Sequence, residues 1–334
     1  MKIPNRHAYI RSVGRFLPER RLTNQDLEKL VDTSNEWILS RTGIRERRIL
    51  EPGLGNSYMA IRAALDCLER GGTAPSEVDA IIVGTVTPDM FYPATACLVQ
   101  QGIGATHAWG FDLSAGCSGF IFSLTTGVQM IESGRYEKVL VIGSDVMSSI
   151  VDYEDRNTCV LFGDAAGAVL LEPCPEDGYG VLDFIHRVDG AGGKHLQQKA
   201  GGSRRPASLE TVRNREHYVY QEGQQVFKFA VKEMANVSVQ ILGKNGLTGK
   251  DVAFFLPHQA NLRIIDASAS RMGLDPGQVV VNIDRYANTT AGTIPLCLYD
   301  VVVEEKQVKK GDYLVMSAFG AGFTWGSVLT RWWE

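Results

Sequence analysis

The sequence lacks several features that would assign it to a specialised class of protein. No two of its 6 cysteines have the CxxC spacing typical of a metal or redox site. Neither sign of charge dominates, because 34 Lys and Arg face 38 Asp and Glu, for a formal net charge of −4. This balance argues against general nucleic-acid binding, although it is compatible with a local basic patch. With 44% hydrophobic and 22% charged residues, the composition excludes disordered, collagen-like and coiled-coil chains.

Long hydrophobic runs are also missing. Residues 1–6 do not begin an apolar stretch of the kind found in signal peptides. The longest span that resembles a membrane segment, residues 113–131, has no charged residue but contains many Ser, Thr and Gly residues, and therefore predicts a helix buried inside protein rather than in lipid. In a chain without a signal peptide the cysteines are expected to be reduced thiols. We therefore expect a cytoplasmic protein.

Glycine, in contrast, is abundant. The chain has 35 glycines among 334 residues, which is about a tenth, whereas the usual share is roughly 7%. This excess predicts a fold in which main chains approach each other closely at many places. The length fits one oversized domain or two fused ones.

Apolar runs typical of strands alternate with patterns typical of helices along the chain. Such alternation predicts a layered α/β fold with mostly buried sheets. In the first half, we expect strands at residues 78–84, 108–113 and 138–143 and helices at residues 57–70 and 117–133. In the second half, we expect strands at residues 252–257 and 312–318 and helices at residues 218–245, 261–272 and 291–303.

The two halves also resemble each other in sequence. FGDAAGAVL at residues 162–170 is similar to FGAGFTWGSVL at residues 319–329. Val141 and Val315, in equivalent strands, are 315 − 141 = 174 positions apart. We therefore predict two similar α/β units, residues 1–178 and 179–334, although glycine-rich strand ends that arose separately would give the same pattern. The polar, glycine-rich segment 187–217 interrupts the repeat and is either a lid or wall of a site or a solvated excursion.

Cys117 is the strongest single candidate for chemistry. It follows a predicted buried strand and a short turn, and it opens the uncharged helix. A thiol at a helix N-terminus faces the positive end of the helix dipole, which favours the thiolate, and the free N–H groups there could bind an oxyanion. The alternative is a buried structural cysteine, which is the commonest fate of a free cysteine.

His258 and Asn288 complete a candidate constellation. His258 directly follows the strand predicted at residues 252–257, and Asn288 lies in the turn that enters the helix at 291–303. Sites in open α/β sheets assemble at the carboxyl ends of strands, so these two residues and Cys117 are expected to converge where the two units meet. Papain-like proteases also have Cys, His and Asn in this chain order, but their local C-G-x-C-W signature is missing.

Several motifs together resemble the thiolase superfamily and, more narrowly, the β-ketoacyl-[acyl carrier protein] synthase III family. The first three are DLSAGCSGF (112–120), PHQANLR (257–263) and NTT (288–290). Further matches are DTSNEWI (32–38), RTGIRER (41–47), FGD (162–164) and FGAGFTWG (319–326). Matches of this kind span residues 22–329, which is nearly the whole chain.

The resemblance implies an internally duplicated thiolase-like fold with five α-β-α-β-α layers. It also implies decarboxylative condensation of acetyl-CoA with malonyl-acyl carrier protein, the first step of type II fatty acid synthesis. Cys117 would carry the acetyl group. His258 and Asn288 would donate hydrogen bonds to the malonyl thioester oxygen, which requires a proton on Nε2 of a neutral His258. The acetyl oxyanion would lie between the backbone N–H groups of Cys117 and Ala321.

The same resemblance implies binding roles for other residues. The positions that would bind CoA are Trp37, Arg41, Arg156, Gly223, Ala260 and Asn261. The positions that would line the acyl pocket are Phe162, Phe319 and Tyr92, with Tyr92 supplied by the neighbouring subunit of a homodimer. The positions that would bind the acidic carrier protein are Gln259, Ala260, Asn261, Leu262, Arg263 and Lys228.

No resident cofactor or metal is implied, because the CoA thioesters are substrates. Gly116, Gln224 and Thr290 depart from the expected pattern and leave short branched acyl-CoA primers open. A starter synthase of polyketide or quinolone biosynthesis is the alternative enzyme. A carrier-binding module without catalysis is the alternative outside enzymes, and the presence of Cys117, His258 and Asn288 argues against it.

Overall fold

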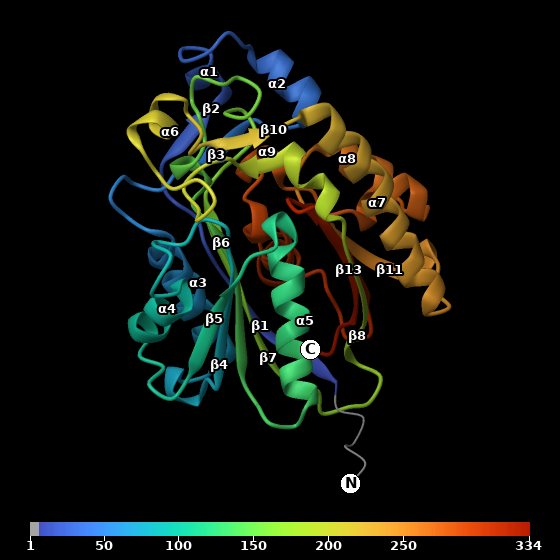
Figure 1. Ribbon diagram of the computed structural model, residues 1–334. Helices are drawn as coiled ribbons and strands as arrows, with labels where there is room; N and C mark the ends of the chain where they lie inside the picture. Colours follow the sequence, from blue (N-terminus) through green and yellow to red (C-terminus); the bar gives the residue numbers. More distant parts are fainter. Residues whose placement is uncertain (1–6) are drawn as a thin grey trace.

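The computed structural model describes residues 7–334 and contains two large β-sheets with helices around and between them (Figure 1). Residues 1–6, on which the expectation about a signal peptide rests, lie outside the described part. The first sheet is made of β1 (Ala8–Phe16), β4 (Ala80–Gly84), β5 (Trp109–Leu113), β6 (Val139–Asp145) and β7 (Ala165–Pro173). The second sheet is made of β8 (Gly180–Val188), β11 (Val252–Pro257), β12 (Tyr313–Gly320) and β13 (Thr324–Arg331).

The four strands of the second sheet follow the same order as four of the five strands of the first. The first has the order β1-β7-β6-β4-β5, and the second, read from its other edge, has the order β8-β13-β12-β11. The directions also match, because β4–β6 and β11–β12 are parallel, whereas β6–β7 and β12–β13 are antiparallel. The predicted boundary between residues 178 and 179 falls in the connection between β7 and β8.

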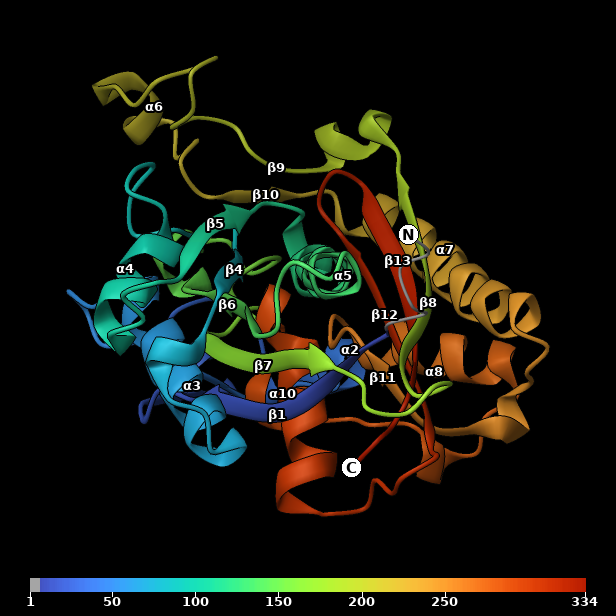
Figure 2. The ribbon, with the colours of Figure 1, turned by 90° about the horizontal axis from the view of Figure 1, so that it is seen from below.

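Three helical layers alternate with the two sheets. In Figure 2, α5 (Gly119–Glu132) is seen end-on between the sheets, where α10 (Thr293–Tyr299) also lies. One central core joins both sheets through Ile121, Leu124, Val141, Ile294 and Leu314. A second core packs α3 (Asn56–Gly71) and α4 (Thr95–Ile103) on the first sheet, and a third packs α7 (Gly223–Lys244) and α8 (Leu262–Met272) on the second. The predicted five-layered α-β-α-β-α fold is therefore confirmed.

The uncharged span at residues 113–131 becomes the end of β5, a short turn and most of α5. Nine residues of α5 are buried between the sheets, which explains why this helix carries no charge before its last residue, Glu132. No helix within residues 7–334 is long and apolar enough to cross a membrane.

One half-buried histidine packs against α5 and gives stability a dependence on pH. His186 of β8 lies between the rings of Phe122 and Phe184, and its Nε2 is 2.8 Å from Thr125 Oγ1. Burial lowers the pKa of His186 to about 4. An unfolded histidine has a pKa near 6.5, so between pH 6.5 and pH 4 the unfolded chain binds a proton that the folded chain does not.

We expect the free energy of unfolding of wild type, relative to a His186→Phe variant, to fall by roughly 2–3 kcal/mol between pH 7 and pH 4. Taking the difference removes the titration of groups that both proteins share. Urea unfolding at several pH values measures it. A constant difference between wild type and His186→Phe would contradict the prediction.

The structure corrects three predicted helices. Residues 218–245 divide into β10 (Val219–Gln221) and α7, because β10 pairs with β9 (Leu196–Gln198), a partner distant in sequence. Residues 117–133 divide into a 3₁₀ turn at Gly116–Ser118 and α5, so Cys117 precedes the helix instead of opening it. Residues 291–303 begin with a 3₁₀ turn and end with a π-helical turn at Asp300–Glu304, on either side of α10.

Segment 187–217 is folded rather than irregular. It contains a 3₁₀ helix at Gly190–His195, strand β9 and helix α6 (Leu209–Arg213). Arg215 forms an ion pair with Asp152, and the Val219 N–H donates to the Ile150 carbonyl at 2.8 Å. These contacts fix the β9–β10 hairpin against the first unit.

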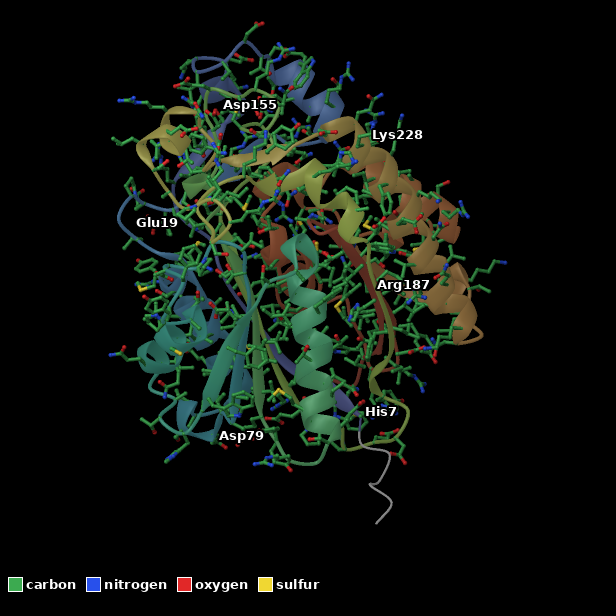
Figure 3. All side chains as sticks on the ribbon, in the orientation of Figure 1. His7, Glu19, Asp79, Asp155, Arg187 and Lys228 are labelled. Atoms are coloured by element: carbon green, nitrogen blue, oxygen red, sulfur yellow. The ribbon has the colours of Figure 1, made fainter. Side chains whose placement is uncertain are left out.

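The carboxyl ends of β5 and β11 point toward the same end of the molecule. Asp79, which precedes β4, and His7 lie at the opposite end, far from Lys228 near the start of α7 (Figure 3). Residues that follow β5 and β11 therefore meet at the end where α7 begins.

Candidate active site

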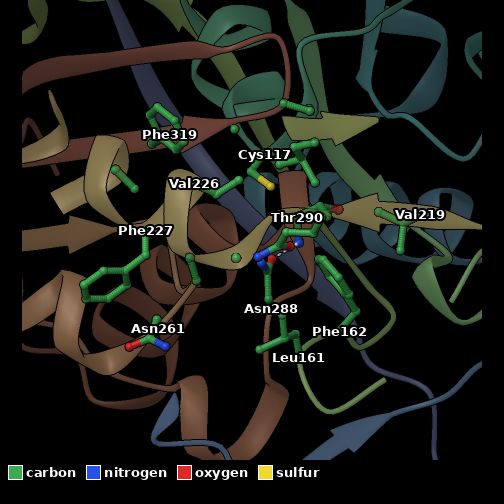
Figure 4. Close-up of a pocket in the computed structure, with 18 of the residues that line it drawn as sticks. Cys117, Leu161, Phe162, Val219, Val226, Phe227, Asn261, Asn288, Thr290 and Phe319 are labelled. Carbon is green, nitrogen blue, oxygen red and sulfur yellow. Dashed lines mark hydrogen bonds between the residues drawn. The ribbon is translucent and has the colours of Figure 1, made fainter. Parts of the chain in front are cut away.

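A cavity of about 650 Å³ lies at the carboxyl ends of β5 and β11 and contains the three predicted catalytic residues. Cys117 is in the turn after β5, His258 directly follows β11, and Asn288 lies in the segment before α10. Figure 4 shows the Cys117 sulfur and the Asn288 side chain directed toward the same part of the cavity. Other predicted site residues that line this cavity are Trp37, Arg41, Phe162, Gly223, Ala260, Asn261, Arg263, Phe319 and Ala321.

The thiol of Cys117 has the opposite electrostatic setting from the one the sequence predicts. Its side chain is almost fully buried. Burial, and to a smaller extent the nearby carboxylate of Asp145, raises the pKa of Cys117 to about 12. The expected stabilisation of a thiolate by the helix N-terminus is outweighed, because the free energy lost when a thiolate leaves water is larger than its favourable interaction with the helix dipole. Cys117 therefore rests as a neutral thiol and must lose a proton to react.

His258 is a neutral imidazole deep in the cavity. Its side chain is 1% exposed, and burial lowers the pKa of His258 to about 3. Its Nδ1 lies 2.7 Å from Thr293 Oγ1, whereas its Nε2 is buried without a hydrogen-bond partner within residues 7–334. A buried polar atom without a partner is uncommon and marks a place where a ligand can bind.

The hydrogen bonds of Thr293 determine which nitrogen of His258 carries the proton. Thr293 Oγ1 donates to the Thr290 carbonyl at 3.0 Å. Because a hydroxyl has one proton, Thr293 then accepts from Nδ1–H of His258, and Nε2 is left as an acceptor. The expected Nε2–H form arises when the Thr293 hydroxyl turns from the carbonyl toward Nδ1.

Asn288 is held so that its amide nitrogen faces the cavity. Its backbone N–H donates to the Leu161 carbonyl at 3.0 Å, and its own carbonyl accepts from Gly163 N–H at 3.1 Å. Its Oδ1 accepts from the Thr290 N–H at 2.9 Å (Figure 4). The acceptor end of the side chain is thereby occupied, which leaves the Nδ2 donor for a ligand.

A buried carboxylate fixes the turn that follows Asn288. Asp145, the last residue of β6, is fully buried and accepts hydrogen bonds from the hydroxyls of Thr290, Thr85 and Thr87. Burial raises the pKa of Asp145, and these hydrogen bonds oppose that shift. Asp145 thus joins the turn at residues 289–291 to the loop after β4.

The mouth of the cavity carries an aromatic ring between two guanidinium groups. Trp37 and Arg41 lie one turn apart on α2 (Asn35–Thr42). The guanidinium carbons of Arg41 and Arg156 are 6.0 Å and 5.6 Å from the Trp37 ring centre. Asn261, the N-cap of α8, donates to the Arg41 carbonyl at 2.8 Å and so joins α8 to α2. An indole beside two cations suits a nucleotide with phosphates.

Five predicted binding residues do not line the cavity: Arg156, Tyr92, Gln259, Leu262 and Lys228. Tyr92 is 85% exposed within one chain. Gln259 requires a correction, because it is fully buried and cannot contact a carrier protein. Its Nε2 donates to the Pro257 and Val280 carbonyls, and its Oε1 accepts from the N–H groups of residues 282 and 283. Gln259 therefore supports the His258 turn from inside.

The sequence did not single out one wall of the cavity. Leu196, Gln197 and Gln198 of β9, with Val219 and Gln221 of β10, line it. Segment 187–217 is thus a wall of the site, which is one of the two alternatives expected from the sequence. Its polar composition gave no signal for these particular residues, because only the pairing of β9 with β10 directs them inward. Within the described chain, no cluster of three or more His, Cys, Asp or Glu side chains could hold a metal ion.

Comparison with known proteins gives consistent similarities over the whole chain. Residues 111–190 match the sequence profile of 3-oxoacyl-[acyl-carrier-protein] synthase III, and residues 242–332 match that of its C-terminal part. A β-ketoacyl-[acyl-carrier-protein] synthase III of Koribacter versatilis is 56% identical over 329 residues, covering 98% of each chain.

Solved structures agree. The crystal structure of 3-oxoacyl-[acyl-carrier-protein] synthase III from Aquifex aeolicus superposes with a TM-score of 0.89 at 42% identity, over 97% of this chain and all of the other. The priming β-ketosynthase of the R1128 polyketide pathway has a TM-score of 0.90 at only 32% identity, over 100% of this chain and 99% of the other. The sequence is therefore nearer to the Koribacter versatilis and Aquifex aeolicus proteins than to this polyketide enzyme.

Proposed function

The chain belongs to the β-ketoacyl-[acyl-carrier-protein] synthase III family, and on that premise we propose how its cavity carries out the family's reaction. The enzyme is an acyltransferase that starts fatty acid synthesis by condensing an acyl-CoA with malonyl-acyl carrier protein. The observation that carries the proposal is the meeting of Cys117, His258 and Asn288 in one cavity. Acetyl-CoA is the primer that we propose.

In the first half-reaction Cys117 takes the acyl group. Its sulfur attacks the thioester carbon, the carbonyl electrons move onto oxygen, and CoA leaves with the proton that the thiol loses. Since burial raises the pKa of Cys117, the thiol needs a base. Because burial keeps both the thiol and His258 neutral, the proton moves as the S–C bond forms: Nε2 of His258, a buried acceptor in the same cavity, accepts it in the transition state and passes it to the departing CoA sulfur.

In the second half-reaction malonyl-acyl carrier protein loses CO₂. Negative charge then develops on the thioester oxygen, and donors already in place stabilise that charge most in the transition state. Asn288 supplies Nδ2, and His258 supplies Nε2–H once the Thr293 hydroxyl turns toward Nδ1. The carbanion attacks the acyl group on Cys117, which yields acetoacetyl-acyl carrier protein and expels Cys117 as a thiolate, and this thiolate takes up a proton from solvent.

The first test is to incubate the protein with acetyl-CoA, digest it and analyse the peptides by mass spectrometry. One acetyl group should appear on the Cys117 peptide. A comparison of kcat/KM among several acyl-CoA thioesters then establishes which one is the primer. Absence of an adduct from folded protein with every acyl-CoA tried would refute the first half-reaction, and a preference for malonyl-CoA over malonyl-acyl carrier protein would favour a polyketide-type starter synthase.

Carrier-protein binding should depend on Arg263. This exposed residue lies at the rim of the cavity with its guanidinium 4.8 Å from the Phe227 ring centre, near Lys228 of α7. An acidic partner is attracted by such a patch on a protein with net charge −4. We expect Arg263→Glu to raise KM for malonyl-acyl carrier protein by about tenfold, as measured in steady-state assays at low salt.

Arg271→Glu, at the other end of α8, makes the same change of charge at an exposed site and is the matched control. It should leave this KM within about twofold. An equal rise of KM for acetyl-CoA in Arg263→Glu would assign Arg263 to CoA binding instead.

We also propose that the enzyme is a cytoplasmic homodimer that needs no cofactor. The reaction involves no change of oxidation state, and the loss of CO₂ drives it. Met90, Phe91 and Tyr92 form an apolar loop tip that is 48%, 80% and 85% exposed, which is typical of a surface covered by a partner. Light scattering in solution should give the mass of two chains, and a Phe91→Asp variant should shift it toward one.

A further inference from the structure

Two turns from opposite halves of the chain touch beside the nucleophile. A Cβ on Gly320 would lie 2.4 Å from the Cys117 nitrogen, and a Cβ on Gly116 would lie 2.7 Å from the Ala321 nitrogen. Only glycine allows main chains to approach this closely, and Gly116 also has a φ of +55°. Within residues 7–334, the N–H groups of Cys117 and Ala321 donate to no other residue. Two free donors therefore lie in adjoining turns.

Crossed hydrogen bonds join these turns. Ser118 Oγ donates to the Thr324 carbonyl at 3.0 Å, and Thr324 Oγ1 lies 2.8 Å from the Ala115 carbonyl. Thr324 Oγ1 is also 3.0 Å from the carbonyl of Ala321, so this hydroxyl lies within reach of both turns. Both Ser118 and Thr324 are buried, and neither lines the cavity.

We propose that Ser118 and Thr324 are positioning residues for the pair of N–H groups that bind the oxyanion. An oxyanion hole acts only when its donors are 2.7–3.1 Å from the developing charge, and a misplacement of about 1 Å can cost on the order of 10²-fold in rate. The donors come from residues about 200 positions apart, so no local structure sets their separation. Thr324, which lies three residues after Ala321, sets it by donating its one hydroxyl proton to the Ala115 carbonyl, two residues before Cys117.

The inference rests on the proposed function and predicts a division between chemical steps. An oxyanion forms when Cys117 attacks the acyl-CoA, and another forms when the carbanion attacks acyl-Cys117. In both, a new bond to the carbonyl carbon forms and the π electrons move to oxygen. The loss of CO₂ places charge on a different oxygen, which Asn288 and His258 bind. Weakening the crossed hydrogen bonds should slow both attacks on a carbonyl carbon and leave the rate of CO₂ loss unchanged.

The decisive variant is Thr324→Val, which keeps the shape of the side chain and removes its hydroxyl. Rapid-quench mass spectrometry should show the acetylation of Cys117 slowed by about 10- to 100-fold. In a Cys117→Ala background, release of CO₂ from malonyl-acyl carrier protein should stay within about twofold with or without Thr324→Val. Thr324→Ser, which keeps the hydroxyl, should recover most of the acetylation rate.

Thr330→Val is the matched control. Thr330 lies on the same strand, is 1% exposed, and its hydroxyl has no hydrogen-bond partner in the described chain. It should acetylate at the wild-type rate. Ser118→Ala should slow acetylation, and combined with Thr324→Val it should cost less than the product of the two single effects, because both act on one contact.

Three results would overturn the proposal. Acetylation of Thr324→Val at the wild-type rate would show that the crossed hydrogen bonds do not set the donors. Equal losses of acetylation and CO₂ release, with a lower Tm and no recovery in Thr324→Ser, would show a structural role only. No acetyl adduct on wild-type Cys117 with any acyl-CoA would refute the proposed function, and this role with it.

Discussion

Replacing Cys117 by alanine should abolish acetyl transfer and lower the rate of condensation by at least about 10³-fold. The reason is that, within residues 7–334, no other thiol lines the cavity, and without the thioester the two half-reactions cannot be separated. Asn288 and His258 stay in place, so the variant should still bind malonyl-acyl carrier protein and release CO₂ slowly. Mass spectrometry after incubation with labelled acetyl-CoA measures the first effect, and acetoacetyl product measures the second.

Cys97→Ala is the control for the loss of a thiol, since Cys97 is exposed and outside the cavity. It should acetylate and condense at the wild-type rate. Acetyl-CoA turnover retained in Cys117→Ala would show that Cys117 is one of the buried structural cysteines. Cys67 and Cys297, both fully buried in apolar cores, are cysteines of that kind.

Replacing Asn288 by alanine should leave acetylation of Cys117 within about threefold but lower condensation by about 10²- to 10³-fold. Its Oδ1 is bound to the Thr290 N–H, so Nδ2 is the part of the side chain left for substrate. That donor acts on the malonyl oxygen, where charge develops only in the second half-reaction. Single-turnover mixing of pre-acetylated enzyme with malonyl-acyl carrier protein isolates this step.

Asn288→Asp is the informative companion variant, because it keeps the size of the side chain and replaces the Nδ2 donor with an acceptor. Condensation should stay low in it. Recovery in Asn288→Asp, or an equal loss of acetylation and condensation in Asn288→Ala, would mean that Asn288 acts by holding the turn. That turn is already held by Asp145 through Thr290, so its collapse in Asn288→Ala is not expected.

The elements that the sequence predicted well are those set by local pattern. β11 has the predicted bounds, and α8 differs only in that Asn261 is its N-cap. Apolar runs that end in glycine or a polar cap specify such elements without help from distant residues. The prediction of a helix over residues 218–245 was wrong at its first residues, where the structure has β10. The pairing of β10 with β9 overrides the local helical pattern, and a short stretch of sequence does not reveal it.

What the sequence determined by itself is which residues can do the chemistry: a cysteine, a histidine and an asparagine, each placed after a strand or before a helix in motifs of one family. The tertiary structure alone decided their chemical state. It buries Cys117 beside Asp145 and so raises the pKa of the thiol, where a helix N-terminus had suggested the reverse. It also buries Gln259, which the family resemblance had placed at the carrier-protein surface, and it leaves Nε2 of His258 in the cavity without a hydrogen-bond partner within residues 7–334. The physical reason is that burial, and with it the energy of a charge or a hydrogen bond, depends on which distant segments pack around a residue, and no local pattern records them.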